Sequence, residues 1–159
     1  MKKYIIYGII FVSALGTLLH FTYGWSDNNF VVGLFSPVNE STWEHMKLVF
    51  FPMLLYSFAG VKKRPCLTSA MAFAILFGTL LMPALFYTYS GILGFNVAFV
   101  DISIFFICVF SAFYVANKYA KNCKMQPYKK LLNLIVIAFA VLFVVFTVYP
   151  PNIGLFVAP

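Results

Sequence analysis

Long apolar stretches alternate with short polar segments along all 159 residues of this chain. A helix needs about 20 mostly apolar residues to cross a bilayer, because the hydrocarbon core is ~30 Å thick and each residue adds ~1.5 Å. Five stretches meet this length: residues 4–25, 41–61, 66–89, 97–117 and 131–149. None shows the alternation of a membrane β-strand. The pattern therefore predicts an all-α, polytopic membrane protein, a five-helix bundle in which residues 1–159 form a single transmembrane domain.

The basic residues gather on alternate connections between these stretches. Ten of the eleven Lys and Arg residues precede the first stretch, follow the second or follow the fourth: Lys2, Lys3, Lys62, Lys63, Arg64, Lys118, Lys121, Lys124, Lys129 and Lys130. Positively charged connections remain on the cytoplasmic side of a membrane. We therefore expect the N-terminus inside and the C-terminus outside, since a frame of four or six spans would divide these clusters between both faces.

The composition supports a membrane protein and excludes several other classes. Apolar residues make up 63% of the chain and charged residues 9%, whereas a soluble domain carries about a quarter charged residues. The formal charge of +7 is sorted by membrane side, so no nucleic-acid partner is expected. Membrane lipids are the expected partners, and a homo-oligomer is left open. Cys66, Cys108 and Cys123 fall in the inner half or the middle of the spans, so no external disulfide is expected.

Three ionisable side chains fall at one depth in three different spans. His20 lies five residues before the outer end of its span, and His45 and Asp101 each lie four residues into theirs. At ~1.5 Å per residue, all three are about 6–8 Å below the outer boundary. An ionisable residue inside a span costs about 2.5–3.5 kcal/mol on insertion scales and is a functional candidate by default. We therefore expect these groups to converge on a polar site in the outer half of the bundle.

The densest polar run of the chain lies at the start of the second predicted span. Ser41 followed three residues later by Glu44 has the form of a capping box, so the helix is expected to begin there. Glu40, Glu44 and Lys47 would then share one face, and Trp43 would lie in an interfacial aromatic belt. A structural interpretation is also open for these residues, because the helix macrodipole stabilises carboxylates in a first turn.

Small residues indicate which helix faces approach one another. Gly16, His20 and Gly24 recur every four residues, so His20 is expected to face protein rather than lipid. The last span offers only Asn133 and Thr147 among apolar residues. It is expected to form a lipid-facing wall.

The run Val38-Asn39-Glu40-Ser41-Thr42-Trp43-Glu44-His45, together with His20 in the preceding span, resembles a family of small bacterial integral membrane proteins of unknown function. The resemblance covers nearly the whole chain and implies a multi-pass protein of the bacterial plasma membrane, without implying a reaction. A looser similarity is to membrane hydrolases of the ceramidase and adiponectin-receptor type, which hold zinc with three histidines. This chain has two histidines and no His-x-x-x-His pair.

The first functional hypothesis is a membrane-embedded enzyme, a hydrolase or transferase acting on a lipid or lipid-linked substrate. The candidate ligands for a divalent metal such as Zn²⁺ are two imidazoles and up to three carboxylates: His20, His45, Glu44, Asp101 and Glu40. Two imidazoles and a carboxylate leave a position for the water that a catalytic metal activates. A spare carboxylate would be the general base, and Lys47 would stabilise an oxyanion. In a metal-free version, Glu44 and His45 would act as acid and base.

Two other hypotheses remain open at this point. Intramembrane histidines and carboxylates also form proton or ion relays, which would make the chain a small ion-coupled transporter or a transporter subunit. Alternatively, the polar residues only hold the helices together in a non-catalytic membrane partner or immunity-type protein. Each of these residues alone can be explained by a structural role. None of those explanations accounts for the common depth of His20, His45 and Asp101.

Overall fold

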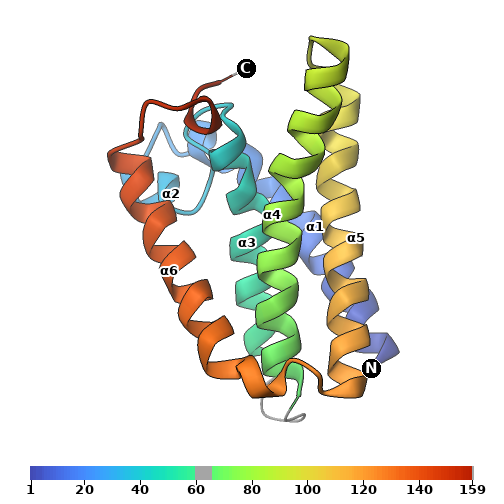
Figure 1. Cartoon of the computed structure of the whole chain (residues 1–159). Helices are drawn as coiled ribbons and strands as arrows, with labels where there is room; N and C mark the ends of the chain where they lie inside the picture. Colours follow the sequence, from blue (N-terminus) through green and yellow to red (C-terminus); the bar gives the residue numbers. More distant parts are fainter. Residues whose placement is uncertain (60–65, 159) are drawn as a thin grey trace.

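Each of the long apolar stretches forms a helix in the computed structural model, which describes residues 1–59 and 66–158 (Figure 1). The elements in chain order are α1 Lys2–Trp25, α2 Phe30–Gly33, α3 Thr42–Phe58, α4 Leu67–Leu93, α5 Ala98–Asn122, η2 Gln126–Tyr128, α6 Lys129–Val148 and η3 Gly154–Phe156. No strand occurs within the described residues. The all-α prediction is confirmed.

The number of membrane-crossing helices differs from the prediction. Among the described residues, four helices are long and apolar enough to cross a membrane: α1, α4, α5, and α6 together with η2. The second predicted span, residues 41–61, is represented by α3, which has only 17 residues and is shorter than the ~20 that a bilayer requires. Ser41 caps its start and Phe58 is its last residue, so the structure does not support a count of five spans.

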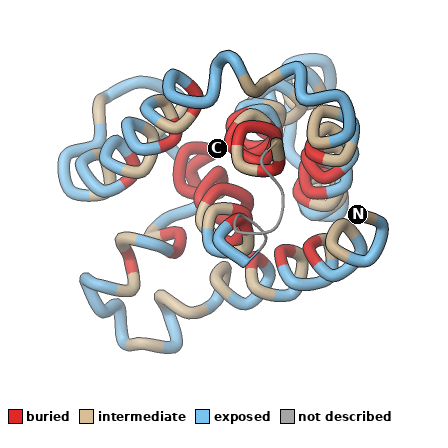
Figure 2. The backbone as a smooth tube through the Cα atoms, turned by 90° about the horizontal axis from the view of Figure 1, so that it is seen from below, coloured by how far each residue is buried: buried red, intermediate tan, exposed pale blue. Residues whose placement is uncertain are grey.

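Helix α3 lies at the centre of the bundle and is largely buried by α1 and α4. Figure 2 shows buried residues gathered at the centre, whereas the outer sides of the peripheral helices are exposed. These outer sides carry large apolar side chains, such as Phe110 on α5 and Leu134 on α6, which suit a lipid environment. Trp43 is only 6% exposed and packs on the rings of Phe143 and Phe156. Its predicted place in an interfacial belt is wrong, because η3 and α6 cover it.

The glycines of α1 show where this helix touches its neighbours. A methyl group on Gly16 would lie 2.6 Å from the Leu48 carbonyl oxygen of α3 and 2.6 Å from the Phe105 ring of α5. Only a glycine allows this close approach, so the expected packing face is confirmed at Gly16. At Gly24 a methyl group would meet no described residue within 4 Å, so the close contact ends before the outer end of the helix.

The two ends of the bundle differ in charge. The N-terminus and the α5–α6 connection lie at one end, and the C-terminus, α2 and the α4–α5 connection lie at the other (Figure 1). The first end carries Lys2, Lys3 and the lysines around the α5–α6 connection. The third predicted basic cluster, residues 62–64, lies outside the described residues. All four acidic residues fall at the opposite end of the bundle or near it: Asp27, Glu40, Glu44 and Asp101.

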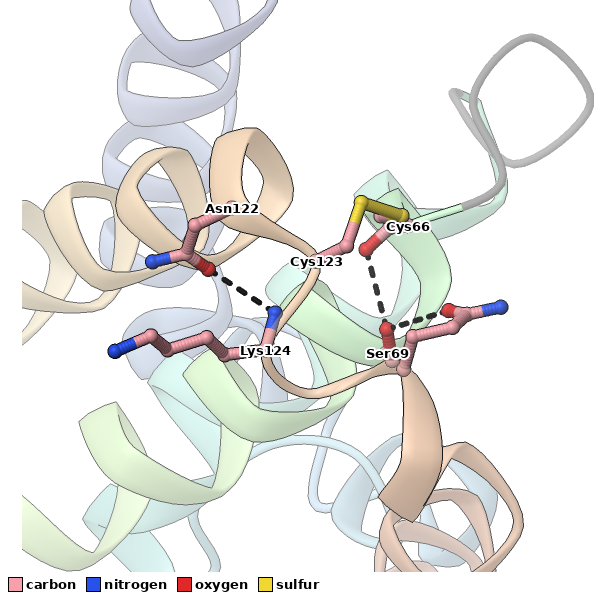
Figure 3. The surroundings of a disulfide bond; sticks show 6 residues. Cys66, Ser69, Asn122, Cys123 and Lys124 are labelled. Atoms are coloured by element: carbon pink, nitrogen blue, oxygen red, sulfur yellow. Dashed lines mark hydrogen bonds between the residues drawn. A yellow bond between two sulfur atoms is a disulfide. The ribbon is translucent and has the colours of Figure 1, made fainter.

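A disulfide closes the basic end of the bundle (Figure 3). It joins Cys66, just before α4, to Cys123, which follows α5 in a left-handed conformation with φ of 53°. The Ser69 hydroxyl lies 3.0 Å from Oε1 of Gln126 and so links α4 to η2 beside the disulfide. The sequence places both cysteines at this end but does not predict their bond, because they are 57 residues apart. Cys108 is free and buried.

Candidate functional site

The start of α3 positions His45 and Glu40. The Ser41 hydroxyl accepts the Glu44 N–H at 3.4 Å, and Oδ1 of Asn39 accepts the Ser41 N–H at 2.9 Å, so the helix begins where the sequence predicts. Nδ1 of His45 lies 2.9 Å from the Ser41 carbonyl oxygen. A carbonyl oxygen only accepts, so Nδ1 is the donor of this contact. Nε2 lies 3.3 Å from Oε2 of Glu40.

His20 of α1 completes this cluster. Its ring centroid lies 5.2 Å from that of His45, and ligand atoms of His20, Glu40 and His45 all lie within 4.8 Å of one another. The close contact at Gly16, one turn before His20, brings α1 against α3 and sets this distance. Nδ1 of His20 is buried and has no hydrogen-bond partner within the part of the chain that the structure describes. We call these three residues the His/Glu triad.

The His/Glu triad lines a pocket of about 730 Å³ between α1, α3, α4 and α5. Asp101 of α5 lines the same pocket, and its carboxylate accepts the Tyr89 hydroxyl. The Tyr89 oxygen in turn accepts the Val97 N–H at 3.3 Å. His20, His45 and Asp101 thus line one pocket from three helices, whereas the cluster of ligand atoms within 4.8 Å contains Glu40 in place of Asp101.

Glu44 and Lys47 form a separate cluster. Nζ of Lys47 lies 2.6 Å from Oε2 of Glu44, and the two side chains are 0% and 3% exposed. The same ammonium donates to Oγ1 of Thr147 at 2.6 Å and to the Gly33 carbonyl at 3.0 Å. Oε2 of Glu44 also accepts the Val38 N–H at 3.0 Å. Neither Glu44 nor Lys47 lines the pocket, so the five predicted metal ligands fall into two groups.

Thr147 belongs to this second cluster although α6 is predicted to be a lipid-facing wall. Its hydroxyl oxygen accepts a hydrogen bond from the Lys47 ammonium, and the hydroxyl donates to the Phe143 carbonyl at 2.6 Å. The wall prediction is therefore wrong at this position. A single threonine in an apolar helix was the only signal for the contact, and spacing along the chain does not reveal a partner that is 100 residues away.

The comparison with protein families gives one result. A model for a family of unknown function (DUF6512) matches residues 1–158. The chain belongs to this family. Curated proteins contain no match to it, and solved structures contain none either.

The triad of this DUF6512 chain has the donor set of a catalytic metal site. Two imidazole nitrogens and one carboxylate oxygen match the ligands of several zinc enzymes, which keep a fourth position open. The contact of Nδ1 of His45 with a backbone carbonyl is the outer support that such ligands use to fix their orientation. The unpartnered nitrogen of His20 fits the same interpretation, because a buried polar atom costs free energy unless it finds a partner. The donor set therefore fits a divalent ion.

The remaining pocket residues of the DUF6512 chain are mostly apolar, and sequence reasoning did not find them. Phe105 and Ile104 of α5, with Met82 and Phe86 of α4, form much of the wall. Phe105 lies one helical turn after Asp101 and therefore shares its face. That spacing was the available signal. It distinguishes a pocket wall from an ordinary buried face only when the neighbouring helix is known.

Proposed function

We propose that this chain is a membrane-embedded enzyme, a hydrolase or transferase for a lipid or lipid-linked substrate, with a divalent metal such as Zn²⁺ held by His20, His45 and Glu40. One observation carries the proposal: ligand atoms from these residues lie within 4.8 Å of one another at the edge of a pocket of about 730 Å³. This volume is in the range of small-molecule sites, about 300–1,000 Å³.

The chain's own residues take distinct roles in this proposal. An ion bound at the triad would polarise a substrate oxygen and acidify a water molecule. Asp101, which lines the same pocket and is held by Tyr89, would accept the proton as general base. The Lys47 ammonium is enclosed by Glu44, Thr147 and a carbonyl. It therefore holds the start of α3 and so positions His45, in place of the oxyanion role that the sequence suggests.

The proposed membrane frame has five passes with the N-terminus inside. The chain passes from the acidic to the basic end through α3, which the other helices surround. A helix enclosed by protein need not reach both membrane surfaces, because neighbouring helices shield its ends from lipid. The lysines would then place the basic end in the cytoplasm and the His/Glu triad in the outer half of a bacterial plasma membrane. The Cys66–Cys123 disulfide at the basic end argues for the opposite orientation, because disulfides are rare in the cytosol. Cysteine labelling decides between the two.

Metal analysis tests the proposed function directly. We expect the purified protein to carry a stoichiometric divalent ion by inductively coupled plasma mass spectrometry, and the His20→Ala, His45→Ala and Glu40→Gln variants to lose most of it. Each substitution removes one of three ligands, and two ligands hold a divalent ion poorly. The matched control is Asp27→Asn, because Asp27 is an acidic residue in the exposed turn after α1 with φ of 55°, which asparagine tolerates.

Two results would contradict the enzyme proposal. A metal-free wild-type protein, or variants of the triad that bind as much metal as Asp27→Asn, would show that the triad is no metal site. Flux driven by a proton or ion gradient in proteoliposomes, without turnover of lipid esters, would show a transporter instead.

Cysteine labelling tests the orientation. In a Cys66→Ser variant the exposed Cys123 is a free thiol at the basic end, and Cys108 remains buried. We expect a membrane-impermeant maleimide to label Cys123 only after the cells are permeabilised. A cysteine at Asn152, introduced into a variant that lacks Cys66 and Cys123, lies at the opposite end and should be labelled in intact cells. The reverse labelling pattern would invert the frame.

A further inference from the structure

Helices α1 and α5 are in close contact from Gly8 to Gly16 of α1, and they separate beyond Gly16, toward the outer end of the bundle. A methyl group on Gly8 would overlap the Phe113 ring, and one on Gly16 would lie 2.6 Å from the Phe105 ring. At Gly24 a methyl group would meet nothing within 4 Å in the part of the chain that the structure describes. In Figure 1, α1 runs obliquely behind the nearly upright α5. The two helices therefore enclose a wedge that widens toward the outer end of the bundle.

The pocket reaches the side of the bundle through this wedge. Four of its lining residues on these two helices are exposed, and we take them as its rim: Thr17 and Phe21 of α1, and Ala98 and Ile102 of α5. Phe21 is 48% exposed and Ile102 is 58% exposed, so the rim belongs to the apolar outer surface of the bundle. In the proposed membrane frame this surface faces acyl chains rather than water.

The pocket is amphipathic along its length. The polar groups of the triad and of Asp101 lie at the end where α3 and α5 begin, and aromatic and aliphatic side chains such as Phe105 form the wall below them. The start of α3 would lie close to the lipid headgroups. A bilayer lipid has the same order of groups, with its ester linkages near the surface and its chains below.

We propose that the wedge between α1 and α5 binds one acyl chain of an ester lipid, which enters sideways from the outer leaflet and places its ester carbonyl at the His/Glu triad. This inference rests on the proposed function and names its substrate class. The volume of about 730 Å³ suits one small ligand, which favours a single chain over a whole two-chain lipid. The proposed hydrolase would act on an ester and release the free fatty acid as its product, so the ligand proposed here is the ester.

Photo-crosslinking in vesicles tests the acyl-chain site. The probe is phosphatidylcholine with a diazirine in one acyl chain, and mass spectrometry locates the crosslinked residues. We expect crosslinks to Leu48 and Phe105 inside the pocket in the wild-type protein. The rim variants Thr17→Trp and Ile102→Trp fill the entrance and should lower these crosslinks severalfold.

Matched controls use exposed residues of the same two helices that do not line the pocket. Leu18 is 50% exposed and Ile107 is 48% exposed, so Leu18→Trp and Ile107→Trp add the same bulk to the surface without closing the entrance. We expect wild-type crosslinking in both. Equal crosslinking in the rim and control variants, or no crosslink inside the pocket, would overturn the acyl-chain site. Stronger crosslinking by a diazirine fatty acid than by the ester probe would overturn the preference for an ester.

Metal content measured on the same samples separates this inference from the proposed function. Bound metal without crosslinks inside the pocket would retain the metal site and remove the acyl-chain site. Crosslinks inside the pocket of a metal-free protein would retain the acyl-chain site and remove the metal site. The rim variants should keep their metal, because neither Thr17 nor Ile102 belongs to the triad.

Discussion

The Lys47→Met variant is expected to lose about 3–5 kcal/mol of the free energy of unfolding, because removal of one partner leaves a buried charge uncompensated. The Glu44 carboxylate is 3% exposed and lies 2.6 Å from Nζ of Lys47. Without Lys47, the Thr147 hydroxyl and the Gly33 carbonyl also lose their donor. Denaturant titration of the detergent-solubilised protein, followed by circular dichroism, measures the loss.

A double variant distinguishes loss of the charge balance from loss of packing. Glu44→Gln combined with Lys47→Met removes both charges and keeps an amide oxygen that accepts the Val38 N–H. We expect it to be more stable than Lys47→Met alone, because an ion pair replaced as a unit leaves no buried charge. Lys124→Met, at an exposed lysine, should be close to wild type. A double variant as unstable as the single one would show that the ion pair is not the source of the effect.

The Gly16→Val variant is expected to lose about 1–3 kcal/mol of the free energy of unfolding, the usual cost of overpacking a close contact, and also to lose its bound metal. A side chain at Gly16 must push α1 away from the Leu48 carbonyl, which a methyl group would approach to 2.6 Å. That movement carries His20 away from His45. Metal sites require ligand positions within about 0.5 Å, so metal content should fall even where the protein still folds.

Gly24→Val is the matched control for this prediction. It makes the same substitution in the same helix, but a methyl group there would meet nothing within 4 Å. Valine has a slightly higher helix propensity than glycine, so propensity would not account for a loss of stability in either variant. If Gly24→Val lowered stability and metal content as much as Gly16→Val, helix contact at Gly16 would not be what holds the His/Glu triad together.

The two polar clusters at the start of α3 have different roles. Glu44, Lys47 and Thr147 join α3 to α6, and the Gly33 carbonyl joins α2 to the same group. This network is buried, and the Lys47 ammonium donates to three partners within it. Its role is therefore structural. His45 of the His/Glu triad follows Glu44 directly in the sequence but faces the pocket. Nδ1 of His20, also in the triad, has no hydrogen-bond partner among the described residues.

Much of the candidate site follows from depth, which the sequence determines. Each residue advances a helix by ~1.5 Å, so the distance of His20, His45 and Asp101 from the ends of their apolar stretches places them at one level. The polar start of α3 at Ser41 follows from local capping chemistry in the same way. The side of the bundle that carries the lysines follows from their positions between the apolar stretches.

Only the tertiary structure decides what lies beside each side chain. The rotation of a helix about its axis and the identity of its neighbour depend on packing over the whole chain, not on local spacing. Glu40 therefore joins the histidines and Glu44 joins Lys47, although both carboxylates belong to one short run. Packing also decides that α3, which has only 17 residues, is enclosed by the other helices. Contacts between distant segments, such as Thr147 with Lys47 and Cys66 with Cys123, leave no local pattern from which they can be predicted.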